Sequence, residues 1–296
     1  MAPRIRQTVW NCVREARPSV QVAFLLRYLA GAVLGHPGGF LNPGRVAVGA
    51  TGWLLATTAI YLFNGVADRP EDVRNGSTRP IASGLLAVRT ALTAAVALGA
   101  AGLACSLALG PGPAALLALH LLLGYAYSGP PFPLKRTYYT CTATGLAAGL
   151  NTYLAGFLAG GHRLDGSLLV FAGMMTLWMG GVGGVAKEFS DIEGDRSAGR
   201  MTWPIVFGVD GATRLLRLLA VGVALAFGAF AGLFSTRLLW CAATVLVGAL
   251  AVLVTSEGLR GRVGRSRRRR PYVAFMWTQH ATHLVLGLTV LAVPLS

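Results

Sequence analysis

Long apolar stretches recur along this chain and are separated by short polar segments. Nine of them are about 17 to 25 residues long, which is the length that an α-helix needs to cross the hydrocarbon core of a bilayer. They lie at residues 20–40, 45–66, 85–109, 113–129, 137–160, 167–189, 212–234, 236–258 and 272–295. The pattern predicts an all-α protein, a polytopic membrane bundle of about nine transmembrane helices.

Composition agrees with this prediction. Of the 296 residues, 54% are hydrophobic and only 12% are charged, about half of the charged share that is typical of soluble domains. We expect one integral-membrane domain over 1–296, with 1–16 as a cytoplasmic N-terminal segment and no cleavable signal peptide. The four cysteines are scattered without paired spacing, which indicates neither a disulfide framework nor a zinc site.

The cations lie mainly on one side of the predicted bundle. We count 22 of the 26 Lys and Arg residues in the N-terminal segment and in the loops after the second, fourth, sixth and eighth spans. By the positive-inside rule this side is cytoplasmic. The run "RGRVGRSRRRR" at 260–270 belongs to it, so we interpret this run as a topogenic or anionic-lipid contact and not as a nucleic-acid site. Arg outnumbers Lys 24 to 2, as in GC-rich bacterial genomes, so we expect a bacterial plasma membrane.

The acidic residues are gathered in two of these cytoplasmic loops. Seven of the chain's eleven carboxylates follow the second and sixth spans, and they are Asp68, Glu71, Asp72, Glu188, Asp191, Glu193 and Asp195. Membrane topology favours cations and not carboxylates at these places. We therefore expect a chemical role for the two loops.

The spacing within each loop suggests a metal site. Asn64, Asp68 and Asp72 are each four residues apart, and so are Asp191 and Asp195. On a helix such residues lie on one face, where carboxylates repel one another unless a cation lies between them. Oxygen ligands of this kind suit Mg²⁺ together with phosphate oxygens. The alternative is two solvated loop faces, but two matching motifs after even-numbered spans favour a Mg²⁺-diphosphate site.

These motifs resemble those of the UbiA superfamily of intramembrane prenyltransferases. The stretch "NGVADRPEDVRNGSTRPIASG" at 64–84 is similar to the first signature of the family, and "DIEGDRSAG" at 191–199 is similar to the second, DxxxD. "EARPSVQVAFLLRYLAGAVLG" resembles the family's opening E-x-x-R-P helix, and "YSGPPFPLKR" resembles its loop after the fourth span. The resemblance covers roughly residues 14 to 210 in the right order.

The resemblance implies a helical bundle around a central cavity that opens to lipid, with the two Asp motifs capping the cavity from the cytoplasm. Family members bind a polyprenyl diphosphate through Mg²⁺, ionise its allylic C–O bond and pass the carbocation to an acceptor, commonly an aromatic ring. Carried over by position, the residues that would hold the metal-bound diphosphate are Asn64, Asp68, Asp72, Asp191 and Asp195. Those that would contact its oxygens are Arg74, Arg79, Tyr127 and Lys135.

Two features of the first motif depart from the family. Many members have an Asp directly after the Asn, and here that place is taken by Gly65. Pro70 lies between Asp68 and Asp72, where it removes a backbone amide. We expect the helix to kink or end near Arg69 and a turn to present Asp72.

Polar residues deep in the spans bear on the acceptor. Arg27 lies ten residues after Arg17, roughly 15 Å along a helix, and could contact an acidic acceptor, the diphosphate, or only a backbone carbonyl or headgroup. His280 and His283 share a face of the last span, where they could line the acceptor end or serve as satisfied interhelical histidines. Candidate aromatic residues for the cavity wall are Phe24, Tyr28, Tyr61, Tyr153, Trp178 and Trp277, with lipid-facing anchoring as the alternative for each.

Three classes of function fit these observations. The first is an aromatic prenyltransferase, and the second is a terpene cyclase that uses the same ionisation machinery without an acceptor. The third is a transporter, but most of the charged groups lie at one end of the bundle and not through its depth. We therefore favour Mg²⁺-dependent prenyl transfer from a prenyl diphosphate to an acceptor within the membrane lipid, and we expect an aromatic acceptor.

Overall fold

The computed structural model describes residues 2–35, 41–161, 166–259 and 263–292, which are almost entirely helical. The long helices are α2 (Pro18–Leu34), α3 (Pro43–Ala67), α5 (Val88–Leu107), α6 (Pro111–Ser128), α7 (Tyr138–Gly160), α12 (Gly208–Phe234), α13 (Leu239–Thr255) and α15 (Arg270–Ala292). A further long helical segment runs through α8 (Gly166–Leu177), the π-helical η2 (Trp178–Gly183) and α9 (Gly184–Glu188). The short elements are α1 (Ala2–Glu15), α4 (Arg69–Arg74), η1 (Leu134–Arg136), α10 (Ile192–Ser197), α11 (Trp203–Val206), η3 (Thr236–Leu238) and α14 (Arg265–Arg268).

Each predicted apolar stretch overlaps with one of the long helical segments, although the ends of the stretches at 20–40 and 272–295 lie outside the described residues. Five segments of the described chain are long and apolar enough to cross a membrane, namely Pro43–Ala67, Val88–Leu107, Gly166–Glu188, Gly208–Phe234 and Thr236–Thr255. The prediction of a polytopic helical membrane protein is confirmed. The number of nine spans stays a prediction.

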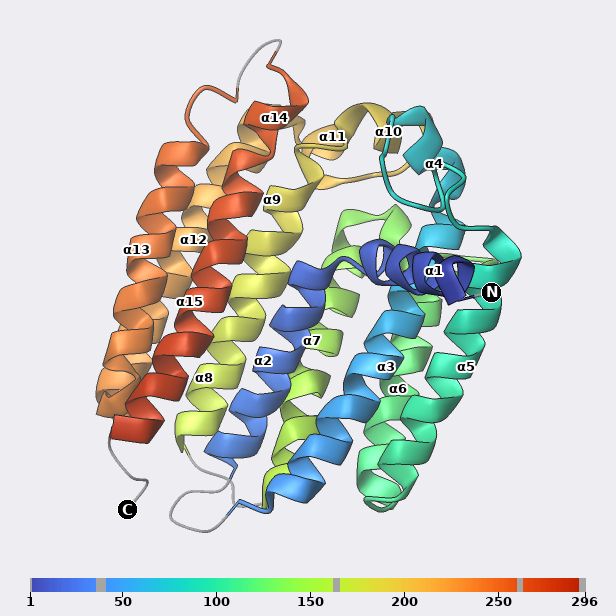
Figure 1. Ribbon diagram of the computed structural model, residues 1–296. Helices are drawn as coiled ribbons and strands as arrows, with labels where there is room; N and C mark the ends of the chain where they lie inside the picture. Colours follow the sequence, from blue (N-terminus) through green and yellow to red (C-terminus); the bar gives the residue numbers. More distant parts are fainter. Residues whose placement is uncertain (1, 36–40, 162–165, 260–262, 293–296) are drawn as a thin grey trace.

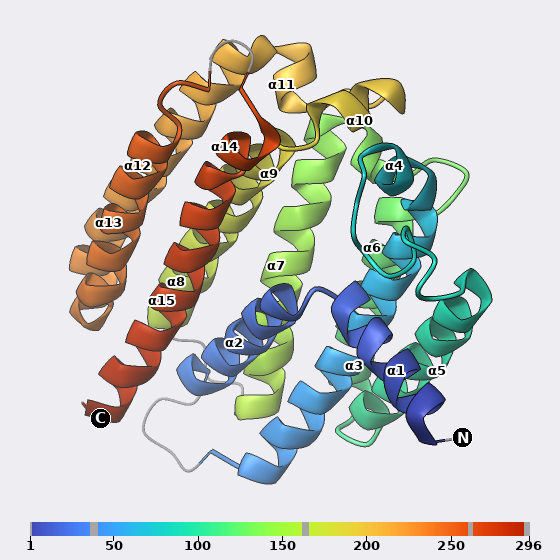
Figure 2. The same cartoon turned by 45° about the horizontal axis from the view of Figure 1, so that its top comes forward.

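The long helices run side by side as one bundle (Figure 1). Helix α2 packs against α7, α3 packs against α5, and α13 packs against both α12 and α15. Helix α1 lies across the outside of the bundle (Figures 1 and 2). The short helices α4, α10, α11 and α14 gather at one end, which we call the cap (Figure 1).

Helices α2 and α7 approach closely because glycine lies at their contact. A Cβ atom at Gly31 would meet the backbone oxygen of Tyr153, and Cβ atoms at Gly156 and Gly160 would meet carbonyl oxygens of α2. Small residues spaced four apart permit this approach of two backbones. The contact fixes the position of α2, which carries several of the residues of the candidate site.

Pro70 separates the first acidic motif into two helices. Helix α3 ends at Ala67, and α4 begins at Arg69 with Pro70 in its first turn. Proline cannot continue the hydrogen bonds of α3, but it is well suited to the first turn of a new helix. The expected helix end near Arg69 is confirmed. The expectation of a turn at Asp72 is wrong, because the chain restarts at once as α4.

Candidate active site

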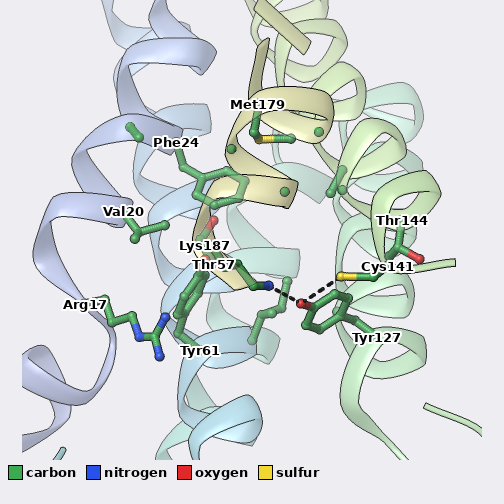
Figure 3. Close-up of a pocket in the computed structure, with 18 of the residues that line it drawn as sticks. Arg17, Val20, Phe24, Thr57, Tyr61, Tyr127, Cys141, Thr144, Met179 and Lys187 are labelled. Atoms are coloured by element: carbon green, nitrogen blue, oxygen red, sulfur yellow. Dashed lines mark hydrogen bonds between the residues drawn. The ribbon is translucent and has the colours of Figure 1, made fainter. Parts of the chain in front are cut away.

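A cavity opens beneath the cap between α2, α3, α6, α7, α9 and α15. Its lining residues near the cap include Arg17, which directly precedes α2, and Asn64, Tyr127 and Lys187, which come from α3, α6 and α9. Figure 3 shows Arg17, Tyr127 and Lys187. Farther along the same helices the wall contains Phe24, Ala148, Met179 and Phe275. The cavity is therefore polar at the cap and mainly apolar below it.

Backbone hydrogen bonds of the helical i to i−4 type link the three residues of the first motif, although α3 and α4 are separate helices. The amide of Asp68 donates to the carbonyl of Asn64 at 2.8 Å, and the amide of Asp72 donates to that of Asp68 at 2.8 Å. Asn64 lines the cavity, and its Oδ1 accepts a hydrogen bond from Ser128 at 2.7 Å. The predicted stacking of the three side chains along one face is thus supported by successive backbone bonds.

The second motif has the same one-turn arrangement. Asp191 caps α10, and the amide of Asp195 donates to the carbonyl of Asp191 at 2.9 Å. Helix α10 packs against α4 in the cap (Figure 1). The fold therefore brings together two acidic motifs that are more than a hundred residues apart in the sequence.

Arg200 joins the two motifs. Its Nη2 donates to Oδ1 of Asp68 at 2.9 Å and also bonds to Glu71, while its Nη1 donates to Oδ1 of Asp195 at 3.0 Å. Sequence reasoning missed this residue. The signal that could have found it is a cation five residues beyond Asp195, in a loop dense with carboxylates.

The ion pairs affect ionisation in the cap. Burial raises the pKa of the Asp68 carboxyl, but Lys135 and Arg200 outweigh burial and hold that pKa below its usual range. Burial raises the pKa of Glu71 and of Asp195, since the pairing with Arg200 does not fully offset their loss of water. The cap is thus a set of partly desolvated charges that compete for few cations.

Further cations from other parts of the chain pair with acidic residues of both motifs. Lys135 bonds to Asp68, and Arg265 of α14 donates to Oδ1 of Asp191 at 3.0 Å. A second arginine of the same helix pairs with Glu193. The arginine run that we interpreted as topogenic therefore also touches the second motif, although its residues 260–262 lie outside the described ones.

Arg79 holds Asp72 by an ion pair of 2.7 Å and is itself paired with Glu15 at 2.6 Å. The Glu15 side chain is fully buried and accepts a hydrogen bond from the amide of Ile81 at 2.9 Å. A Cβ atom at Gly65 would collide with this carboxylate. The departure from the family at Gly65 thus has a physical reason, because glycine leaves room for Glu15.

Two further predicted diphosphate contacts lie in different surroundings. Tyr127 lines the cavity, and its hydroxyl accepts a hydrogen bond from Lys187 at 2.6 Å and contacts Cys141 at 3.5 Å (Figure 3). Arg74 is exposed on α4 and pairs with none of the described carboxylates. Lys187 and Arg17 are cavity cations that sequence reasoning did not assign.

The cavity end farthest from the cap has buried polar side chains with individual atoms that lack hydrogen-bond partners. Arg27 is 3% exposed, His120 is 2% exposed and Gln279 is 1% exposed, and all three line the cavity. Arg27 Nε, His120 Nδ1 and both polar atoms of the Gln279 side chain have no hydrogen-bond partner among the described residues. We call these three residues the deep end.

The two predicted histidines do not lie in the cavity lining. His280 contacts the carbonyls of Met276 and Ser19 at 2.6 and 3.0 Å. His283 contacts the Tyr153 hydroxyl at 2.7 Å and the carbonyl of Gln279. Both are satisfied interhelical histidines, which was the alternative interpretation, and it is Gln279 of the same helix that lines the cavity.

Only part of the expected aromatic wall is present. Phe24 and Tyr61 line the cavity, and Tyr272 and Phe275 add to them. The other candidates lie elsewhere: Tyr28, Tyr153 and Trp178 are buried in helix contacts, and Trp277 is 72% exposed. For Trp277 the alternative of an outward-facing anchor applies, because its side chain projects from the outer face of α15.

The donor set of the cap is suited to a hard divalent cation. The described residues contain no ready-made cluster of three acidic, His or Cys side chains. However, Asp68 and Asp195 converge on a single guanidinium, so one Arg side chain separates carboxylate oxygens of the two motifs. Oxygen donors from two motifs fit Mg²⁺ bridged to phosphate oxygens.

The profile of the UbiA prenyltransferase family matches residues 24–279. The chain belongs to this family. As a UbiA family member it is a prenyltransferase and an integral membrane protein.

Relatives and solved structures agree with this membership. The digeranylgeranylglyceryl phosphate synthase of Halobacterium salinarum is 32% identical over 74% of this chain and 77% of its own length. Two further relatives are each 32% identical to this chain over the part that matches. They are the digeranylgeranylglyceryl phosphate synthase of Natronomonas pharaonis and the protoheme IX farnesyltransferase of Azotobacter vinelandii, and the match covers 60% of the length of each. A UbiA homolog from Archaeoglobus fulgidus, solved with GPP and Mg²⁺ bound, has the same fold, with a TM-score of 0.73 at 20% identity over 93% of this chain and 99% of that one.

Proposed function

We propose that this UbiA prenyltransferase carries out Mg²⁺-dependent transfer of a prenyl group from a polyprenyl diphosphate to an acceptor, within the membrane. One observation carries the proposal. Carboxylates of two distant motifs converge on one guanidinium, and Asn64, one turn before Asp68, lines a cavity with an apolar wall. This arrangement separates a place for a charged leaving group from a place for its hydrocarbon chain.

The residues proposed to hold Mg²⁺ and diphosphate are Asn64, Asp68, Asp72, Asp191 and Asp195. Mg²⁺ supplies Lewis acidity to the leaving diphosphate. The chain's own residues supply the orientation: Ser128 fixes the Asn64 amide, and Arg79 fixes Asp72. The Mg²⁺-bound structure of the Archaeoglobus fulgidus homolog supports the same metal here.

Cations around the cavity mouth are proposed to bind the diphosphate oxygens. Lys135 lies against Asp68, and Lys187 lies against Tyr127 inside the cavity. Arg17 lines the same opening and has its backbone in the left-handed region at φ 56°, directly before Pro18. Such positive charge stabilises the charge that grows on diphosphate as the C–O bond breaks.

The wall below the mouth is proposed to protect the allylic cation. A free carbocation is quenched by water, so its path needs a dry surface with π faces. The Phe24 and Tyr61 rings are in edge contact with centroids 6.4 Å apart, and both residues line the cavity. Their place in the lining makes both suited to a role in the reaction.

The deep end favours an acceptor over a cyclase. Arg27 has no carboxylate within ion-pair distance among the described residues, and its guanidinium lies 5.0 Å from the Phe24 ring centroid. An unneutralised cation beside the reaction path repels a carbocation. An acidic acceptor, such as an aromatic carboxylic acid, would neutralise Arg27 before ionisation, whereas a cyclase has no such group. The names of the relatives span glyceryl phosphate, haem and chlorophyll products and do not select one acceptor.

The bacterial plasma membrane, with the N-terminus and both Asp motifs on the cytoplasmic side, completes the proposal. The test is to incubate purified protein with geranyl, farnesyl or geranylgeranyl diphosphate and Mg²⁺, with and without a panel of hydroxylated aromatic acids. We expect a prenylated acid, and no turnover in excess EDTA. A cyclic hydrocarbon or alcohol formed without an acceptor would establish the cyclase instead.

A further inference from the structure

Arg200 occupies an unusual position for a structural arginine. It forms ion pairs with Asp68 and Glu71 of the first motif and with Asp195 of the second, and its side chain is only 15% exposed. Its backbone is fixed separately, since the Arg200 amide donates to the carbonyl of Asp195 at 2.9 Å and the Met201 amide donates to that of Arg136 at 2.8 Å. The guanidinium can therefore change partners by side-chain rotation alone.

The oxygens that Arg200 holds are those that a divalent cation needs. Both of its motif aspartates use Oδ1 to accept from Arg200, and the Oδ1 of Asp68 also accepts from Lys135. A metal that binds between the motifs must displace at least one of these donors. A guanidinium also binds phosphate oxygens through its planar fork as readily as it binds carboxylates.

We infer that Arg200 is an exchangeable counter-ion of the cap. It competes with a divalent metal for Asp68 and Asp195, and it passes to the diphosphate oxygens when the prenyl diphosphate arrives. The inference rests on the proposed function, because it takes the cap as the site for metal and diphosphate. The exchange explains why an arginine side chain lies at the centre of a site for a metal cation. The protein binds the metal weakly while Arg200 occupies the carboxylates, and it binds the metal tightly together with diphosphate.

A purely structural Arg200 leads to a different expectation. If its task were only to hold α4 against α10, its loss would loosen both motifs and weaken metal and diphosphate binding together. An exchangeable counter-ion instead makes the two affinities move in opposite directions. The metal gains free carboxylates, and the diphosphate loses a cation.

The test measures binding and not turnover. Mn²⁺ is titrated into purified, detergent-solubilised protein by calorimetry, and inorganic diphosphate is then titrated at saturating Mn²⁺. For Arg200→Gln we expect roughly tenfold tighter Mn²⁺ binding and roughly tenfold weaker diphosphate binding, the size of one partly desolvated charge contact. Arg196→Gln is the matched control, because Arg196 is exposed one turn earlier and pairs with none of the described carboxylates.

Further variants keep each outcome decisive. Arg200→Lys retains the charge but cannot bridge both motifs. We therefore expect it to change the Mn²⁺ and diphosphate affinities in the same directions as Arg200→Gln but by smaller amounts. It replaces Arg200→Gln if that variant does not fold. Unchanged or weaker Mn²⁺ binding in the folded variants overturns the inference. Asp68→Ala separates this failure from that of the proposed function: if the wild type binds Mn²⁺ and Asp68→Ala does not, the metal site stands without the Arg200 exchange. If the wild type binds no Mn²⁺ even in the presence of inorganic diphosphate, the metal site itself is wrong.

Discussion

The cap and the deep end treat their charges in opposite ways. In the cap, Asp68, Asp72, Asp191 and Asp195 each have a Lys or Arg partner from elsewhere in the chain. At the deep end, buried polar atoms remain without partners among the described residues. A folded protein normally satisfies such atoms, because an unpaired buried polar group costs about 1 to 3 kcal/mol.

This difference indicates how a ligand would bind at each end of the cavity. The cap is held together by its own ion pairs and can exchange them, so its ligand has to compete. The deep end already bears the cost of unpaired groups, so a ligand with an anionic or hydrogen-bonding head gains their full interaction. We therefore assign ionisation to the cap and choice of acceptor to the deep end.

The largest effect is expected for Asp68→Ala, because this carboxylate is the shared partner of Lys135 and Arg200 and a proposed metal ligand. Diphosphate release and product formation should both fall on the order of 10³-fold. Thermal unfolding should change little, since the side chain lies in the cap and not in the apolar core. Near-normal turnover in this variant would mean that the motif serves topology only.

The next effect is expected for Arg27→Leu at the deep end. Transfer to an acidic acceptor should fall roughly 100-fold, the value of a charged hydrogen bond, while diphosphate release without acceptor stays nearly intact. Loss of both activities would place the guanidinium on the diphosphate instead. If neither changes, Arg27 is only a lipid or carbonyl contact, and the variant should be more stable because an intramembrane charge is gone.

A smaller, selective effect is expected for Lys135→Ala. Its ammonium adds a point charge that attracts the diphosphate in the ground state as well as in the transition state. KM for the prenyl diphosphate should rise roughly tenfold, with a smaller fall in kcat. An unchanged KM would show that Lys135 serves only to pair Asp68.

The smallest effect is expected for Gln279→Leu. Its amide has no partner among the described residues, so the variant removes an unsatisfied buried group and should unfold at an equal or higher temperature. KM for the acceptor should rise about fivefold. Trp277→Leu, on the outer face of the same helix, is the control and should leave both values unchanged. A lower unfolding temperature for Gln279→Leu would mean that the amide is satisfied in the free protein.

The sequence predicted the parts of this account that depend on local pattern. Apolar length located the helices, and the four-residue spacing of Asn64, Asp68 and Asp72 survives as successive backbone bonds despite Pro70. Residue spacing does not show which side of a helix faces the cavity. Only the packing of α15 therefore shows that Gln279 lines the cavity and that His280 and His283 do not.

Contacts between residues that are distant in the sequence could not be predicted either. Arg200 and Glu15 take their roles from contacts with the first motif across more than 60 residues. The sequence places Arg200 in a loop dense with carboxylates, but it shows neither which carboxylates the guanidinium contacts nor which groups Glu15 contacts. The place of Trp277 stayed open for a related reason, since an aromatic side chain suits a cavity wall and a lipid-facing surface equally.

The division between cap and deep end is tested most directly by measuring diphosphate release and prenylated product in parallel, with and without an acidic acceptor, for the wild type, Asp68→Ala and Arg27→Leu. We predict that Asp68→Ala loses both signals, whereas Arg27→Leu keeps diphosphate release and loses the product. Loss of both signals in both variants, or full transfer to the acidic acceptor by Arg27→Leu, would contradict the account.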